Sequence, residues 1–130
     1  MIITVTMNAA IDKSLSVPNV RLGRRHRTVE QRSVAGGKGV NVARVLKALG
    51  QPVIATGFAG GPTGTRIVDY LTDAAILNDF VRIRDESRTN MSVLDPTNGL
   101  QTEINERGPE VDQRGMPRVG PCDAGAYELQ

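Results

Sequence analysis

The sequence is poor in the residues that build disulfides, metal centres and membrane segments. Its 130 residues include one cysteine, one histidine, no tryptophan and four other aromatic residues. The lone Cys122 excludes an internal disulfide and a cysteine-based zinc site, and the lone His26 argues against a multi-histidine metal centre. Apolar runs are too short to span a bilayer, and residues 1–7 lack the basic start of a signal peptide. We therefore expect a cytoplasmic protein with no membrane partner.

Charge and composition are those of an ordinary globular chain. Lysine and arginine number 16 against 14 acidic residues, and the net charge of +2 is too small to indicate a nucleic-acid partner. Apolar residues make up 39% of the chain and charged residues 23%, which excludes a disordered or collagen-like protein. The length predicts a single domain with a core of modest size.

Hydrophobic patterning predicts an alternation of strands and helices. The clearest element is a helix that follows Gly39 and ends at Gly50. Its apolar residues recur at helical spacing and are expected to face the core: Val42, Val45, Leu46 and Leu49. A second helix is expected to follow a loop over residues 59–64, with Thr63 or Thr65 as its cap. Strands are expected at residues 2–7, 14–20, 28–34, 53–58, 80–83, 89–94 and 100–104.

This order of elements predicts the fold class. Its strand–helix–strand–helix part favours an α/β fold with a parallel sheet in a three-layer arrangement. The strands after the first one, and those near Arg88, are predicted to form an antiparallel appendage. From residue 108 onward glycine and proline become frequent and hydrophobic periodicity is lost, so residues 112–130 are predicted to be a tail.

The glycine cluster Gly36-Gly37-Lys38-Gly39 is the first candidate site. It precedes a helix, where free backbone N–H groups and the helix dipole favour an anion or a polar ligand. The spacing fits neither a Walker A loop nor a dinucleotide-binding turn. A glycine-rich turn before a helix is also an ordinary structural feature, and both interpretations stay open.

Asp12 and Asn41 are the next candidates. Asp12 follows the first predicted strand, in a polar turn at the edge where open α/β sheets bind ligands. Asn41 lies in the first turn of the helix that leaves the glycine cluster. A carboxylate and an amide can together bind vicinal hydroxyls of a sugar. A turn residue and a helix-end hydrogen bonder are the structural alternatives.

Arginines supply the remaining candidates. The stretch from Arg21 to Arg32 is locally basic and reads mainly as a solvated loop, from which one or two side chains could meet a phosphate. It lacks interleaved aromatic residues for base stacking, which disfavours a nucleic-acid interface. Arg88, at the start of a predicted strand, is a second phosphate-binding candidate.

The run Gly36-Gly-Lys-Gly-Val-Asn-Val-Ala43, followed by Gly50 and Gly60, resembles the N-terminal signature of the ribokinase/PfkB carbohydrate-kinase family. Residues 6–12, 88–90 and 101–105 are similar to the branch that phosphorylates sugar phosphates, which includes 1-phosphofructokinase and tagatose-6-phosphate kinase. The resemblance covers about residues 1–111. It implies a partial ribokinase-like three-layer sandwich with a small β lid, which forms a dimer interface in many members.

The resemblance also implies roles for particular residues. The sugar hydroxyls would be held by Asp12, the Gly36–Gly37 turn and Asn41. The phosphate already on the substrate would be bound by Arg88, with Arg25 and Lys38 assisting. Family members use ATP and Mg²⁺ to phosphorylate a hexose monophosphate, but their catalytic base and ATP site lie in a later half that has no counterpart in this sequence.

We therefore expect the N-terminal, sugar-binding part of a sugar-phosphate kinase that is inactive alone. The alternative is a non-catalytic sugar-phosphate-binding or dimerisation module. A sheet that stops after its first strands is expected to expose apolar edges and faces. Residues 112–130 are similar instead to a terminal motif of secreted bacterial β-helix proteins.

Overall fold

The computed structural model describes residues 1–111, which form seven strands and two helices arranged as two sheets. The order of elements agrees with the order predicted from the sequence. The elements are β1 (Ile2–Thr6), β2 (Ala10–Ser16), β3 (Glu30–Gly36), α1 (Lys38–Ala48), β4 (Val53–Gly60), α2 (Gly61–Asp73), β5 (Leu77–Ile83), β6 (Arg88–Asp95) and β7 (Leu100–Asn105).

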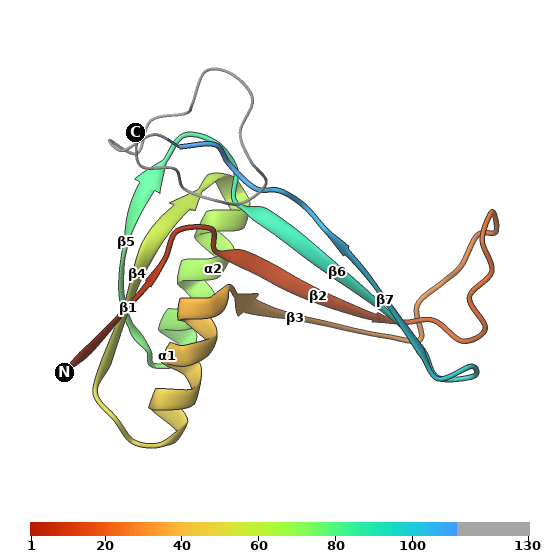
Figure 1. Cartoon of the computed structure of the whole chain (residues 1–130), viewed down its shortest axis with the longest axis horizontal. Coiled ribbons are helices and arrows are strands. Elements are labelled where there is room, and N and C mark those ends of the chain that lie inside the picture. The colour runs from red at the N-terminus through yellow and green to blue at the C-terminus, as the bar shows by residue number, and fades with distance from the viewer. Residues whose placement is uncertain (112–130) are drawn as a thin grey trace.

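The three-stranded sheet has the order β1-β4-β5 and is entirely parallel. Helices α1 and α2 both lie on the same face of it, α1 against β1 and β4, and α2 against β4 and β5 (Figure 1). This is the parallel α/β arrangement that the alternating elements predict. Within residues 1–111 only one face of this sheet is covered by helices, so two of the three expected layers are present.

The core lies between the two helices and the three-stranded sheet. Its fully or almost fully buried members include Val40, Ala43, Val53, Ala55, Ile67 and Leu71. The alanines allow the helices to approach the sheet closely, and Ile67 and Leu71 are the apolar residues that α2 buries in this core. Burial of a Leu or Ile side chain stabilises the folded state by roughly 1.5–3 kcal/mol.

Of the apolar stripe predicted for α1, only Leu46 packs against the core, and the prediction is wrong for the other three residues. Val42, Val45 and Leu49 are 50%, 58% and 68% exposed, and the helix instead buries Val40 and Ala43. The helix carries two apolar faces, and hydrophobic spacing alone does not show which of them meets the sheet. The second face stays uncovered in residues 1–111.

The four-stranded sheet has the order β3-β2-β6-β7 and extends away from the helices (Figure 1). It corresponds to the predicted appendage, although β2 and β6 pair in parallel while the outer pairs are antiparallel. The second strand begins at Ala10, not at residue 14, because the buried residues Ala10 and Ile11 pair with both neighbouring strands.

The predicted loop over residues 59–64 does not exist. Strand β4 runs to Gly60, and α2 begins at the next residue with Pro62 in its first turn. Neither Thr63 nor Thr65 caps the helix. Instead the Glu86 carboxylate accepts hydrogen bonds from the backbone N–H of Thr63, at 3.2 Å, and from its hydroxyl, at 2.6 Å. A carboxylate from a distant part of the sequence therefore accepts a hydrogen bond from a free N–H group at the start of α2. Local sequence cannot reveal such a contact.

Asp95 fixes the far end of the four-stranded sheet. The Asn98 side chain and the backbone N–H groups of Val20, Asn19 and Asn98 donate to its carboxylate, and together they hold the pKa of Asp95 well below its ordinary value. The side chain is 5% exposed. It joins the β6–β7 turn to the loop over residues 17–29, so that the end of β2 and the end of β6 stay together.

Within residues 1–111, neither helix has the length and apolar character needed to cross a membrane.

We expect Ile67→Ala to lower the free energy of unfolding by about 2–5 kcal/mol, because it leaves a cavity at a fully buried position. The measurement is urea denaturation followed by circular dichroism. Val42→Ala is the control on the exposed face of α1 and is expected to change the same quantity by less than about 0.5 kcal/mol. Equal effects of the two substitutions would contradict the packing described above.

We expect Asp95→Asn to lower the urea midpoint at pH 7, because the amide cannot replace the charged acceptor. A carboxyl whose pKa is depressed by folding stabilises the protein above its unfolded pKa and loses that effect as the pH falls. The difference between the native chain and Asp95→Asn should therefore be complete at pH 7 and shrink below about pH 3.9. Asp69→Asn, at an exposed position of α2, serves as control and should show little effect at either pH.

Candidate functional site

The candidate site lies where the four-stranded sheet joins the rest of the molecule. Asp12 on β2 is opposite Asn90 on β6, and the Asn90 side-chain amide donates a 3.0 Å hydrogen bond to the Asp12 carboxylate. Asp12 is therefore a strand residue and not a turn residue, contrary to the prediction. The pairing orients the carboxylate, and the side-chain oxygen of Asn90 has no partner within the described chain.

Gly36 makes room for this carboxylate. A Cβ atom at Gly36 would overlap the Asp12 carboxyl group, so any larger residue would displace it. The next residue, Gly37, has a φ of 104° and is the N-cap of α1 without a side-chain hydrogen bond. Residues with a Cβ rarely adopt such a φ value. The glycine pair is therefore required by the conformation and the close approach at this junction.

A hollow of about 330 Å³ opens beside Asp12 on the four-stranded sheet. Strand alternation places Asp12, Ser14, Asn90, Ser92 and Asn105 on one face of that sheet. All five line the hollow together with Lys13, Met91, Gln101 and Glu103. The Gln101 amide donates to both Ser92 and Glu103, at 2.9 and 3.2 Å. Carboxylates, amides and hydroxyls in this arrangement suit the hydroxyl groups of a polar ligand.

Arg88 adds a positive charge beside this hollow. It is two residues before Asn90 on β6, so both side chains belong to the same face of the strand, about 7 Å apart. Its guanidinium donates to the backbone oxygens of Asn8 and Glu106, at 3.3 and 3.5 Å. A guanidinium has five N–H donors, which leaves capacity for an anion.

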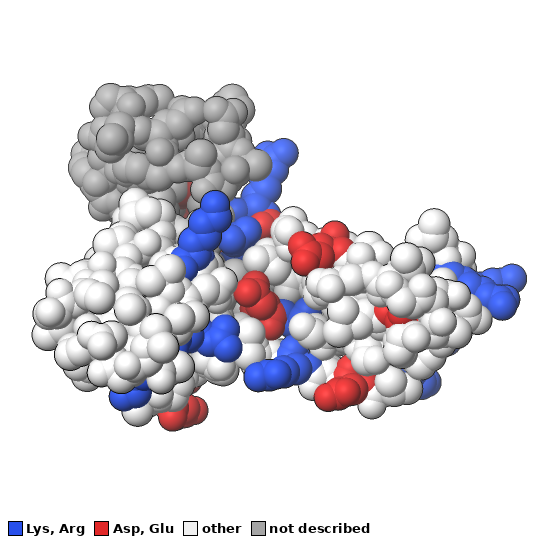
Figure 2. All heavy atoms as spheres, turned by 60° about the horizontal axis from the view of Figure 1, so that its bottom comes forward, with Lys and Arg blue, Asp and Glu red and all other residues white. Residues whose placement is uncertain are grey.

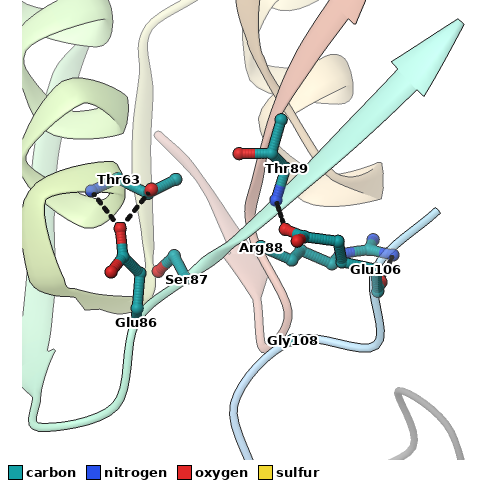
Figure 3. Close-up of a pocket in the computed structure, with 7 residues that line it drawn as sticks. All are labelled: Thr63, Glu86, Ser87, Arg88, Thr89, Glu106 and Gly108. Atoms are coloured by element: carbon teal, nitrogen blue, oxygen red, sulfur yellow. Dashed lines mark hydrogen bonds between the residues drawn. The ribbon is translucent and has the colours of Figure 1, made fainter. Parts of the chain in front are cut away.

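Arg88 also lines a second hollow, of about 420 Å³, between α2 and the beginning of β6 (Figure 3). On one side Glu86 contacts Thr63, and on the other side Glu106 accepts a 2.6 Å hydrogen bond from the Thr89 backbone. Both carboxylates thus hold neighbouring backbone in place. Arg88 therefore lies at the junction of the two sheets.

The remaining predicted residues are divided between this junction and the far end of the molecule. Lys38 is the first residue of α1, and the N–H of Asn41 donates to Gly37, so both lie within one turn of the glycine pair, with exposed side chains. Arg25 is different. Arg25 belongs to the loop over residues 17–29. Asp95, at the end of β6, holds this loop by hydrogen bonds, whereas Arg88 is at the beginning of β6. Seven residues of strand separate those ends by about 23 Å.

Charged side chains gather at the junction and over the four-stranded sheet. In Figure 2 the lobe of the three-stranded sheet shows mostly uncharged surface, while both signs of charge occur together between the lobes. Among residues 1–111 no three His, Cys, Asp or Glu side chains come together as a metal-binding group.

The sequence did not identify Asn90 as a site residue. Its position two residues after Arg88 was the available signal, because alternate residues of a strand share a face. Its contact with Asp12 depends on the pairing of β2 with β6, which are separated by 71 residues of chain between Ser16 and Arg88. No local pattern specifies that register.

These features define a parallel α/β protein with a polar hollow and an adjacent cationic group, an arrangement suited to a phosphorylated polyol. Comparison with known proteins identifies the class. The family model for pfkB family carbohydrate kinases matches residues 2–118, and the chain belongs to this family. That match extends to residue 118, into the segment 112–130 that was predicted as a tail and that lies entirely outside the described residues.

Solved structures agree with this assignment. A candidate phosphofructokinase from Staphylococcus aureus is 37% identical, with a TM-score of 0.79 over 88% of this chain and 37% of its own. Phosphofructokinase-2 from Escherichia coli, solved with fructose-6-phosphate, is 28% identical, with a TM-score of 0.82 over 88% of this chain and 38% of its own. A candidate 1-phosphofructokinase from Thermotoga maritima is 35% identical, with a TM-score of 0.80 and corresponding coverages of 88% and 38%.

The chain therefore spans less than two fifths of the length of these structures. The predicted fold class, a partial ribokinase-like α/β fold, is confirmed.

We expect Gly36→Ala to destabilise the protein by about 1–3 kcal/mol, because the added methyl group overlaps the Asp12 carboxyl group. Urea denaturation measures this effect. Since the nearest atoms all belong to the Asp12 side chain, the double variant Gly36→Ala/Asp12→Ala should recover much of the loss. Additive effects in this double-mutant cycle would show that Gly36 and Asp12 do not interact.

Proposed function

We propose that residues 1–111 form the acceptor-binding part of an ATP-dependent kinase that phosphorylates a hexose monophosphate. The observation that carries this proposal is the placement of Arg88 on the same sheet face as the hydrogen-bonded pair Asp12 and Asn90. A ligand with hydroxyl groups and one phosphate can meet both at once. Family membership and the fructose-6-phosphate complex of Escherichia coli phosphofructokinase-2 support this choice of substrate class.

Each residue has a physical task in this proposal. The Asp12 carboxylate accepts hydrogen bonds from sugar hydroxyls, and Asn90 keeps it oriented. Arg88 binds the phosphate already present on the sugar through charge-assisted hydrogen bonds. The Gly36–Gly37 turn allows the backbone to approach the ligand, while Lys38 and Asn41 extend the same site from the first turn of α1.

Phosphoryl transfer requires more than acceptor binding. Family members use ATP and Mg²⁺, but the described residues provide no group of three acidic or histidine ligands for a metal ion. Kinases usually hold Mg²⁺ with one or two carboxylates together with the phosphates of the nucleotide. We propose that this chain alone holds and orients the acceptor without phosphorylating it.

The second candidate is a sugar-phosphate-binding module that works as a dimer through the four-stranded sheet. The position of Arg25 favours it, because about 23 Å of strand separates the end that holds the Arg25 loop from Arg88. In this arrangement the loop of a second copy brings Arg25 to the phosphate bound by Arg88. The sheet face opposite Asp12 also carries apolar side chains, including Met91, Val93 and Ile104.

We expect the chain to bind fructose 6-phosphate with a dissociation constant of roughly millimolar in isothermal titration calorimetry, since only part of a sugar-kinase site is present. Asp12→Asn and Arg88→Met should each weaken binding about tenfold, because each removes a charged hydrogen-bonding partner. Arg84→Met is the matched control, with an exposed arginine ahead of β6, and should bind as the native chain does.

A coupled assay of ADP formation with the same sugar should show no turnover above background. Equal binding by the native chain and both site variants would reject the proposed site. Robust turnover would instead reject the proposal that this chain only binds the acceptor.

A further inference from the structure

The turn between β6 and β7 contains a chemically reactive pair of residues. In the sequence Asp95-Pro-Thr-Asn-Gly99 an asparagine is followed directly by a glycine, which happens nowhere else in the chain. An asparagine in this position is prone to deamidation, because glycine has no Cβ atom to obstruct attack by its backbone nitrogen on the preceding side chain. Asn98 and Gly99 are both exposed, so that water has access to them.

Deamidation at this turn needs only these two residues and water. The backbone nitrogen of Gly99 loses its proton to a base in the solvent and attacks Cγ of Asn98. A new C–N bond closes a succinimide ring, and the side-chain nitrogen of Asn98 takes a proton from water and leaves as ammonia. A water molecule then opens the ring at either carbonyl carbon, which leaves an aspartate or an isoaspartate at position 98.

The folded turn holds both reacting groups away from each other. The Gly99 N–H donates a 2.9 Å hydrogen bond to the backbone oxygen of Asp95. The Asn98 side-chain amide donates to the Asp95 carboxylate, at 2.8 Å, and to the Asn19 side-chain oxygen, at 3.3 Å. These bonds must break before the nitrogen can reach Cγ, so the reaction requires local opening of the turn.

Asp95 is well suited to keep the turn closed. Its carboxylate is almost fully buried and also accepts a 3.2 Å hydrogen bond from the Asn98 backbone N–H. The donors around it hold the pKa of Asp95 well below its ordinary value, so the carboxylate is charged at neutral pH. Hydrogen bonds to a charged acceptor are stronger than those to a neutral one.

The product of deamidation would reverse this arrangement. A carboxylate at position 98 has no hydrogen to donate, and it would face the Asp95 carboxylate as a like charge. An isoaspartate would in addition lengthen the backbone of the turn by one carbon atom. Either product removes the contact that closes the turn.

The same carboxylate fixes a second segment of the chain. The backbone N–H groups of Asn19 and Val20 donate to Asp95 at 2.8 and 2.9 Å. Figure 1 shows the loop that contains them at the same end of the four-stranded sheet as the β6–β7 turn. Loss of the Asn98 contact therefore weakens the attachment of the loop over residues 17–29, which also carries Arg25.

We propose that Asn98–Gly99 is a deamidation site that the hydrogen bonds of Asp95 protect in the folded chain, and that its modification releases the loop over residues 17–29 from the β6–β7 turn. The proposal concerns the end of the sheet opposite Arg88 and does not depend on sugar binding.

The first test is peptide mapping by mass spectrometry after incubation of the full 130-residue chain in mildly alkaline buffer, with and without guanidinium chloride. We expect deamidation at Asn98 to be about tenfold slower in the folded chain, because the closed turn blocks the attack. Asn19 belongs to the same cluster but is followed by valine, and it serves as the internal control that stays unmodified in both conditions.

Two variants separate the role of Asp95 from the reactivity of the pair itself. Asp95→Asn should bring the rate in buffer close to the rate in denaturant, with circular dichroism as the check that the variant is folded. Gly99→Ala should slow the reaction about tenfold in denaturant, where folding has no influence, because the added methyl group obstructs the attacking nitrogen.

The second test concerns the consequence of the modification and uses Asn98→Asp in place of the product. We expect the amides of Asn19 and Val20 to exchange hydrogen about tenfold faster in this variant, while the amides of β4 stay protected and show that the chain is folded. Thr97→Asp is the matched control, because it adds the same charge to the turn at a residue whose backbone N–H, and not its side chain, donates to Asp95. It should leave both exchange rates as in the native chain.

Equal rates of deamidation in buffer and in denaturant would overturn the protective role of Asp95, and an unmodified Asn98 in denaturant would overturn the site itself. Unchanged exchange at Asn19 and Val20 in Asn98→Asp would overturn the release of the loop.

Discussion

The close approach of the β3–α1 connection to β1 and β2 is the constraint on which the rest of the structure depends. Atoms added at Gly37 or Gly39 would overlap the Thr6 side chain, and an atom added at Gly36 would overlap Asp12. The absence of these side chains allows α1 to start directly against β1, while β3 remains paired with β2. Core packing, the position of the four-stranded sheet and the orientation of Asp12 all follow from this one junction.

The proposed site is built mainly on the four-stranded sheet and is extended by the beginning of α1. The four-stranded sheet contributes Asp12, Asn90 and Arg88, and the beginning of α1 contributes Lys38 and Asn41. The pairing of β2 with β6 therefore determines which side chains meet at the proposed site. A shift of one residue between these strands would turn Asn90 away from Asp12. The carboxylate of Asp95 holds the two strands together at their other end.

The folding of residues 1–111 depends on one covered face of the three-stranded sheet. The helices cover one face of the three-stranded sheet, and the buried core is built largely from alanine and isoleucine. The apolar residues of the other face were expected from the sequence to be exposed, and they are.

Local spacing and composition are enough to predict the order of the elements, the α/β class, the helix after the glycine cluster and the family signature. The folded structure was needed to show that Asp12 lies within a strand and is oriented by Asn90. It was also needed to show that Glu86 caps α2 and that Val42 and Val45 face outward. Each of these depends on contacts between residues far apart in the chain, or on which of two apolar helix faces meets the sheet. Periodicity shows that a face is apolar, but the element packed against it decides whether that face is buried.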